Sequence, residues 1–334
     1  MRACWYSDGR DNRDSYAIIY LYREWADANF SATGGSGLEQ RDFVGYGKTP
    51  PRIEWPDGAR IAVSIVINYE EGSERTPLLG DAVHETAAEL ASVRPPAARD
   101  FQTESQWEYG GRVGIWRMMR ILDEYGVKAT FNISALALEH NPSLGPEIVA
   151  AGHDITGHGY RWIEQWHLDR DAETAYIRKA IQSFEKTCGV RPLAWNTKSG
   201  RSENTREILA ELGFLYDSES FNDDLPHYTR VKGRPWLVLP YALDTNDGRY
   251  WRQGWNTSPE FLQYLKDSFD LLYEEGATYP KMLSIGLHSR VSGRPGRAVA
   301  VRKFIEHIKG HPKVWIARRD DIARWWLKHY PAAG

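Results

Sequence analysis

From Arg60 to Tyr330, short apolar runs rich in β-branched residues alternate with longer segments of helical pattern. The strand-like runs are residues 61–67, 127–133, 153–156, 191–195, 214–217, 236–241, 282–287 and 314–317, and the helical segments are residues 113–125, 146–151, 170–188, 202–212, 259–276, 297–309 and 320–330. Such repetition is typical of a mainly parallel sheet covered by helices. Seven or eight strands in one series predict an α/β fold, a closed or nearly closed (β/α) barrel formed by a single domain of residues 43–334.

The first 42 residues do not follow this pattern. One short amphipathic piece is followed by a stretch rich in glycine and serine at residues 31–37, which is typical of a flexible segment. We therefore predict that residues 1–42 form an N-terminal extension without chemistry of its own.

Charge and cysteine content exclude several classes of protein. Lys and Arg number 42 and Asp and Glu number 45, and a net charge of −3 supplies no broad positive field for nucleic acid. The apolar run between Tyr16 and Tyr22 is too short to cross a bilayer, so no membrane partner is expected. Two cysteines, Cys4 and Cys188, exclude a disulfide framework and favour a cytoplasmic location.

The aromatic content is high. The chain has 14 Trp, 18 Tyr and 10 Phe residues, which make up 13% of its length. Fourteen tryptophans require either a thick core or a pocket with flat walls, and the count alone does not decide between them.

Polar clusters follow several of the predicted strands, at the end of a (β/α) barrel where chemistry takes place. Glu70 and Glu71 end the first strand, and at least one of them should point into the barrel mouth. A carboxylate there serves as a general base or as a hard metal ligand, whereas the alternative is a solvated pair on a loop.

Two histidines stand at other strand ends. His158 lies between Gly157 and Gly159, which allow a ligand to approach the backbone closely. His288 follows an apolar strand, and with an ordinary pKa near 6.5 it can give a proton to a leaving nitrogen. A structural hydrogen-bonding role is the alternative for both.

Several motifs, taken in order, resemble the polysaccharide deacetylase family and in particular its allantoinase branch. They are Asn68-Tyr69-Glu70-Glu71-Gly72, Tyr109-Gly110-Gly111-Arg112-Val113-Gly114, Gly152-His153-Asp154-Ile155-Thr156-Gly157-His158, Pro240-Tyr241-Ala242-Leu243-Asp244-Thr245-Asn246-Asp247 and Ser284-Ile285-Gly286-Leu287-His288. The resemblance covers residues 43–330 and implies a distorted (β/α)₇ barrel.

The chain departs from the metal-dependent members at one position. Those members bind zinc through an aspartate and two histidines four residues apart, whereas here Trp162 stands four residues after His158. Two ligands and a tryptophan do not make the usual open zinc site. The allantoinase branch shows the same loss, so we expect no metal and no other cofactor.

The resemblance implies hydrolysis of a C–N bond in a small cyclic ureide, with allantoin or a related cyclic imide as the substrate. Glu70 or Glu71 would be the base, His158 would orient water or hold the oxyanion, and His288 would be the acid. The candidate substrate-binding residues are Asn68, Tyr109, Arg112, Trp162, Arg201, Asp244 and Asn246. The alternatives are an N-deacetylase of a sugar polymer and a barrel that binds a ligand without turnover. The branch also implies a homo-oligomer, a tetramer in the relatives.

Overall fold

The computed structural model describes residues 41–252 and 254–332. The predicted N-terminal extension therefore lies outside the described residues, except for Arg41 and Asp42.

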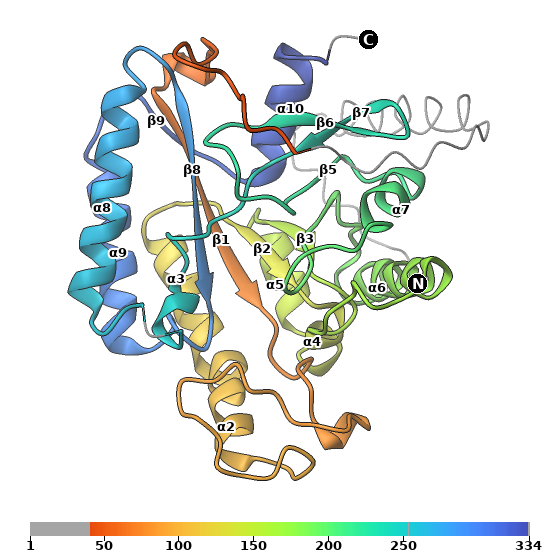
Figure 1. The fold of residues 1–334 in the computed structure, drawn as a ribbon. Helices are drawn as coiled ribbons and strands as arrows, with labels where there is room; N and C mark the ends of the chain where they lie inside the picture. Colours follow the sequence, from red (N-terminus) through yellow and green to blue (C-terminus); the bar gives the residue numbers. More distant parts are fainter. Residues whose placement is uncertain (1–40, 253, 333–334) are drawn as a thin grey trace, which may run out of the picture.

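One nine-stranded sheet forms the centre of the molecule (Figure 1). Its strands are β1 (Ile61–Tyr69), β2 (Thr130–Ile133), β3 (Asp154–Gly157), β4 (Ala194–Trp195), β5 (Tyr216–Asp217), β6 (His227–Val231), β7 (Arg234–Val238), β8 (Lys281–His288) and β9 (Val314–Ile316). The order is β6-β7-β5-β4-β3-β2-β1-β8, with β9 beside the start of β1, and β6 runs antiparallel to β7. An isolated parallel bridge from Asn246 to Gly286 brings the chain after β7 against β8, so the sheet curls into the predicted barrel-like shape.

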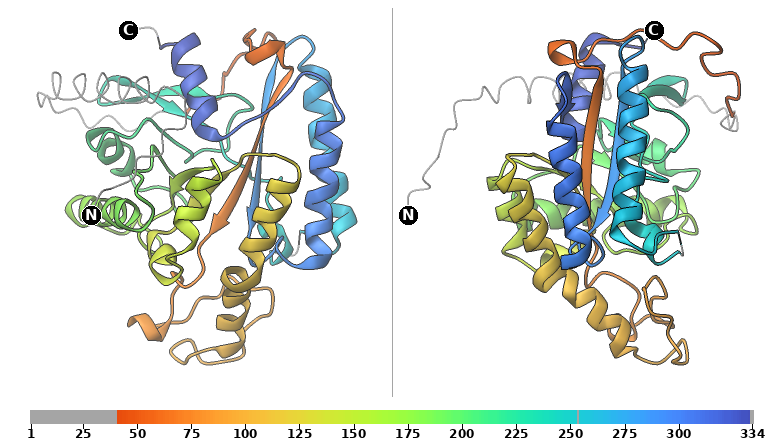
Figure 2. Two further views of the ribbon diagram at one scale, coloured as in Figure 1. Left: turned by 180° about the vertical axis from the view of Figure 1, so that it is seen from behind. Right: turned by 90° about the vertical axis from the view of Figure 1, so that its left-hand side faces the viewer.

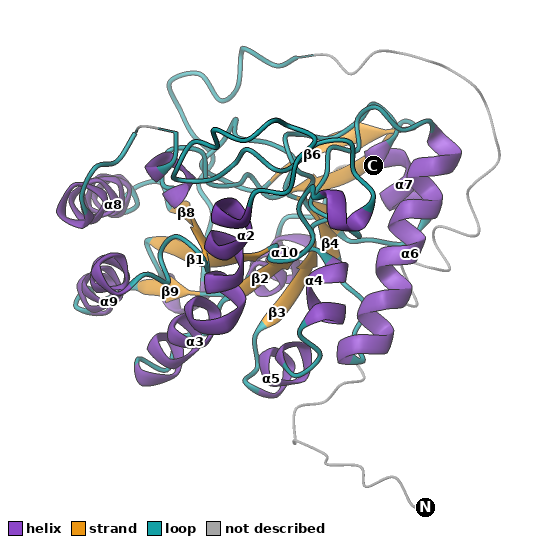
Figure 3. Ribbon diagram, turned by 90° about the horizontal axis from the view of Figure 1, so that it is seen from below, coloured by secondary structure: helices purple, strands orange, loops and turns teal. Residues whose placement is uncertain are grey.

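Helices surround the outside of this sheet (Figure 3). They are α2 (Phe101–Tyr109), α3 (Ile115–Glu124), α4 (Ala135–His140), α5 (Leu144–Ala150), α6 (Arg170–Cys188), α7 (Thr205–Glu211), α8 (Ser258–Glu275), α9 (Pro295–Lys309) and α10 (Arg319–His329), with the short helices η1 (Pro56–Gly58), η2 (Pro77–Leu79) and η4 (Asp247–Tyr250). The π-helix η3 (Gly110–Gly114) joins α2 to α3 in one rod, and α8 and α9 flank β1 and β8 (Figure 2). No helix in the described part of the chain is long and apolar enough to cross a membrane.

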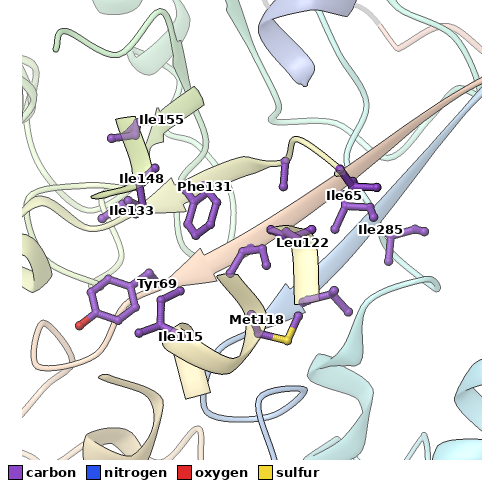
Figure 4. Close-up of a cluster of buried hydrophobic side chains, with 14 of the residues drawn as sticks. Ile65, Tyr69, Ile115, Met118, Leu122, Phe131, Ile133, Ile148, Ile155 and Ile285 are labelled. Carbon is purple, nitrogen blue, oxygen red and sulfur yellow. The ribbon is translucent and has the colours of Figure 1, made fainter. Parts of the chain in front are cut away.

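The two faces of β1 have different partners. Ile61, Ile65 and Tyr69 belong to the core between sheet and helices, where Met118 and Leu122 of α3 are fully buried (Figure 4). Successive side chains of a strand point to opposite faces, so the alternate residues face the inside of the curl. This inner face of the sheet is called the lumen below.

The lumen is filled by polar groups. Asn68 Oδ1 accepts from Asn132 Nδ2 at 2.9 Å, and Asn132 Nδ2 also lies 3.2 Å from Asn196 Oδ1. Closer to the start of the strands, the guanidinium of Arg319 donates to Ser284 Oγ at 2.6 Å and to the carbonyl oxygen of Leu239 at 2.6 Å. These hydrogen bonds favour one arrangement of the strands, because a buried polar group without a partner costs free energy.

Helices α2 and α4 and strand β6 were not predicted. Helix α2 has little apolar periodicity, and the β6 strand is short and half-exposed. The β6–β7 hairpin nevertheless has a local signal in Lys232-Gly233, whose φ angles are 49° and 78°. Two positive φ angles in a two-residue loop are the geometry of a type I′ turn.

Gly114 allows η3 to lie against the loop that follows β8. A Cβ atom at Gly114 would overlap the backbone carbonyl oxygen of Ser289. We expect Gly114→Ala to destabilise the fold by about 2 kcal/mol through overpacking, as measured by denaturant unfolding. Gly296→Ala is the matched control, because no atom lies within 4 Å of its Cβ position, and it should leave stability unchanged or slightly raised. Equal effects of the two substitutions would contradict this interpretation.

Candidate active site

The carboxyl ends of β1, β3 and β8 bring three predicted catalytic residues together. Glu70 Oε1 lies 3.2 Å from His158 Nε2 and 3.6 Å from His288 Nε2. The exposed fractions of these residues are 1%, 5% and 7%, respectively. A carboxylate and two imidazoles therefore meet at one buried point, which we call the Glu70 cluster.

The structure distinguishes Glu70 from Glu71 by the alternation of β1. Glu70 continues the lumen face on which Asn68 lies, whereas Glu71 continues the face of Tyr69. The Glu71 carboxylate accepts from the backbone N–H of Glu70 at 2.9 Å and from the hydroxyl of Ser289. It lines a cavity of about 610 Å³ whose walls include Tyr69 and Arg112 but none of the Glu70 cluster.

Arg290 neutralises Glu70. Its Nη1 atom donates to Glu70 Oε2 at 2.7 Å, and its guanidinium carbon lies 3.7 Å from the ring centre of Trp107 and 5.4 Å from that of Trp162. Burial opposes ionisation of Glu70, but the charges of Arg290 and His288 outweigh it and hold the pKa of Glu70 well below its usual range. Glu70 is therefore ionised at neutral pH.

Asp247 holds His288 from the other side. His288 Nδ1 lies 2.6 Å from Asp247 Oδ1, and the His288 backbone N–H donates to Asp247 Oδ2 at 2.8 Å. Burial alone would lower the pKa of His288, but the negative charges of Glu70 and Asp247 raise it to about 9. The imidazole is thus protonated at neutral pH and presents Nε2–H toward the lumen.

Trp162 donates a hydrogen bond to the unprotonated ring nitrogen of His158. His158 Nδ1 lies 2.6 Å from the carbonyl oxygen of Asn196, which can only accept, so Nδ1 carries the hydrogen. Trp162 Nε1–H then donates to His158 Nε2 at 3.1 Å. An imidazole that accepts from the indole cannot at the same time donate from Nε2 to Glu70.

These contacts do not suit a zinc ion. Zinc needs at least three protein ligands that converge with free lone pairs. His158 Nε2 already accepts from Trp162, and one oxygen of Glu70 accepts from Arg290. Among the described residues, only Asp270, His307 and His311 bring three ligand atoms within 4.8 Å of one another, and they lie outside this cluster.

Two of the predicted substrate-binding residues lie in or next to the lumen. Asn68 is 2% exposed and donates from Nδ2 to Tyr241 Oη at 2.8 Å, so it belongs to the polar layer beneath the Glu70 cluster. Asn246 Oδ1 accepts from the Gly248 backbone N–H at 2.8 Å and so begins η4, the helix that places Asp247.

Four other predicted residues have partners elsewhere. Tyr109 Oη accepts from Arg117 at 2.7 Å, and Arg112 lines the cavity beside Glu71. Arg201 donates to the carbonyl oxygen of Ser202 at 3.1 Å, and exposed Asp244 accepts from Tyr264 Oη at 2.7 Å. None of these contacts places the four residues on the Glu70 cluster, whereas Trp162 lies directly on it.

Sequence reasoning missed Asp247, Arg290 and the aromatic walls formed by Trp107 and Trp251. The Trp251 ring stands edge-on to the His288 ring, with 4.9 Å between centroids. Asp247 ends the polar run in which Asp244 and Asn246 were chosen, and Arg290 stands two residues after His288. A basic residue two positions after a strand-end histidine is a signal that could have identified Arg290.

Comparisons with known proteins agree with this architecture. Residues 106–216 match the polysaccharide deacetylase family model. A Schizosaccharomyces pombe protein described as a "putative polysaccharide deacetylase" is 36% identical over 88% of this chain and 98% of its own length.

Two solved structures are similar over the whole domain. A "probable polysaccharide deacetylase" from Pseudomonas aeruginosa PAO1 has 46% identity and a TM-score of 0.83, and the PuuE allantoinase has 45% identity and a TM-score of 0.83. Each match covers 88% of this chain and 99% of the other chain. The chain therefore belongs to the polysaccharide deacetylase family of hydrolases.

Proposed function

We propose that this chain hydrolyses an amide C–N bond in a small cyclic ureide, with allantoin as the first substrate to test. The observation that carries the proposal is the pairing of ionised Glu70 with protonated His288, whose Oε1 and Nε2 atoms lie 3.6 Å apart at a buried point. One group accepts a proton and the other supplies one, as amide hydrolysis requires. The similarity to PuuE allantoinase supports this choice of substrate class.

In the proposed reaction, water adds to the ring carbonyl carbon and gives one proton to Glu70. The resulting tetrahedral intermediate loses its C–N bond as the ring nitrogen takes the proton from His288 Nε2. Glu70 then holds one proton more and His288 one fewer than at the start. Transfer across the 3.6 Å between the two groups restores both after each turnover.

Arg290 is the proposed donor to the substrate. Its Nη2 atom is buried and has no hydrogen-bond partner among the described residues, while Nη1 is held by Glu70. A guanidinium so placed can stabilise the oxyanion that forms on the ring carbonyl. The rings of Trp107, Trp162 and Trp251 around it supply flat walls for a small planar ring.

We also propose that the reaction needs no metal. The indole N–H of Trp162 uses the lone pair on His158 that a zinc ion would require. In this proposal, Trp162 and the carbonyl oxygen of Asn196 together hold His158 in one tautomer and one orientation beside Glu70.

The first prediction from this proposal concerns substrate and metal dependence. Chelator-treated protein should open the ring of allantoin or of a related hydantoin or imide, as followed by product formation. It should release no acetate from N-acetylglucosamine oligomers. Acetate release that depends on added Zn²⁺ would instead support a polysaccharide deacetylase, and binding without any product would support a ligand-binding barrel.

The second prediction separates the two glutamates. Glu70→Gln should lower kcat by about 100-fold or more, because a general base is lost. Glu71→Gln is the matched control: its carboxylate accepts from Ser289 and lines the neighbouring cavity, and at 3.7 Å from Arg290 Nη1 it makes no hydrogen bond to that residue, so the variant should retain most of the activity. Circular dichroism checks that both variants fold. A larger loss of kcat in Glu71→Gln than in Glu70→Gln would show that Glu71, and not Glu70, is the general base.

The third prediction concerns pH. Because His288 must be protonated and its pKa is raised to about 9, kcat/KM should fall as the pH rises through about 9. Asp247→Asn removes one of the charges that raise this pKa and should move the basic limb of the profile to lower pH. The same raised pKa stabilises the fold fully below the ordinary value near 6.5, and this contribution is lost as the pH rises through about 9. A basic limb that Asp247→Asn does not move would contradict the role given to His288.

A further inference from the structure

We propose a second site on this chain: a surface site for a divalent transition metal, formed by Asp270 of α8 with His307 and His311 at the end of α9. One ligand atom from each of these residues lies within 4.8 Å of the other two. Two imidazoles and one carboxylate are an established ligand set for Zn²⁺, which is the ion we propose for this site. The proposal is independent of the hydrolytic reaction.

The two histidines are spaced by four residues, which is one helical turn. His307 lies in the last turn of α9, and His311 follows immediately after the cap residue Gly310. Their ring centroids are 4.7 Å apart. The sequence holds no acid between them, but the neighbouring helix supplies one: His307 Nε2 lies 2.6 Å from Asp270 Oδ1.

His311 is oriented with one ring nitrogen free. Its Nδ1 atom lies 2.9 Å from the His307 carbonyl oxygen, so Nδ1 donates and Nε2 keeps its lone pair. A hydrogen bond from the second ring nitrogen of a histidine is the usual way in which a protein orients a metal ligand. The carboxyl end of α9 also favours a positive charge at this position.

The floor of the site is rigid. The buried ring of Phe269 lies 5.6 Å from the His307 ring and 5.1 Å from the His311 ring, between centroids. Tyr273 packs 5.1 Å from the His311 ring and donates from Oη to the carbonyl oxygen of Pro312 at 2.9 Å. Three ligand atoms that lie within 4.8 Å of one another can converge on one ion about 2 Å from each of them.

The site lies at the opposite end of the barrel from the Glu70 cluster. The guanidinium of Arg60, which directly precedes β1, is 5.0 Å from the Tyr273 ring, whereas Glu70 directly follows β1. A nine-residue strand spans about 30 Å. A metal here would clasp α8 to α9, which lie side by side (Figure 2), and would stabilise the fold rather than take part in the reaction.

The test uses the full chain stripped of metal with a chelator and then titrated with Zn²⁺. Calorimetry should give one Zn²⁺ per chain at this site, and Zn²⁺ at 100 times its Kd should raise Tm by about 4 °C. Asp270→Asn and His311→Ala should lose this increase. His167→Ala, which removes an exposed histidine elsewhere, is the matched control and should keep it.

Two results would overturn the proposal: no increase in the Tm of the wild-type protein, or an increase that survives in both Asp270→Asn and His311→Ala. Asp270→Asn replaces an exposed side chain with one of the same shape, so this variant should fold without metal. If His311→Ala is unstable, the Tm of Asp270→Asn with and without Zn²⁺ decides the test. Hydrolysis should be the same in all three variants, because the site is remote from the Glu70 cluster.

Discussion

The buried ion pair between Glu70 and Arg290 is the interaction on which the active site depends. A carboxylate that is 1% exposed would be costly without a partner, and removing one member of such a pair costs about 3–5 kcal/mol. Arg290 also fastens the loop after β8 to the end of β1, with Trp107 stacked on its guanidinium. Because the pair keeps Glu70 ionised, Glu70 in turn raises the pKa of His288. One contact thus sets the charge of both proposed proton carriers.

In the proposed metal-free reaction, Trp162, Arg290 and His288 together take the place of a zinc ion. An indole N–H satisfies the lone pair of His158 but brings no charge. The two positive charges of a zinc ion are present instead on Arg290 and on protonated His288, on either side of Glu70. The high tryptophan content accordingly serves two purposes. Trp55 and Trp236 are core residues, whereas Trp107, Trp162 and Trp251 surround Arg290.

The strand series of the sheet and the meeting of Glu70, His158 and His288 were predicted from the sequence, because both depend on local patterns. Apolar runs alternating with helices define the strand series, and residues at strand ends must meet at one edge of a parallel sheet. Asp247 and Arg290 were not predicted, since their contacts with His288 and Glu70 depend on the course of two loops. Tyr109, Arg112 and Asp244 were chosen from motifs alone, and motif membership does not report the direction of a side chain.

Glu70 and Glu71 are adjacent in the sequence, yet the alternation of β1 directs Glu70 to the lumen and Glu71 to the cavity on the other face, with Arg290 Nη1 2.7 Å from the first carboxylate and 3.7 Å from the second. Insertion or deletion of one residue between Ile61 and Tyr69 would exchange the two glutamates and turn the core isoleucines toward the lumen. A glutamate would still face His158 and His288, but the other residues of β1 would point to the wrong faces of the sheet. The length of β1 therefore decides which glutamate faces His158 and His288, so the strand length matters as much as the presence of an acidic residue.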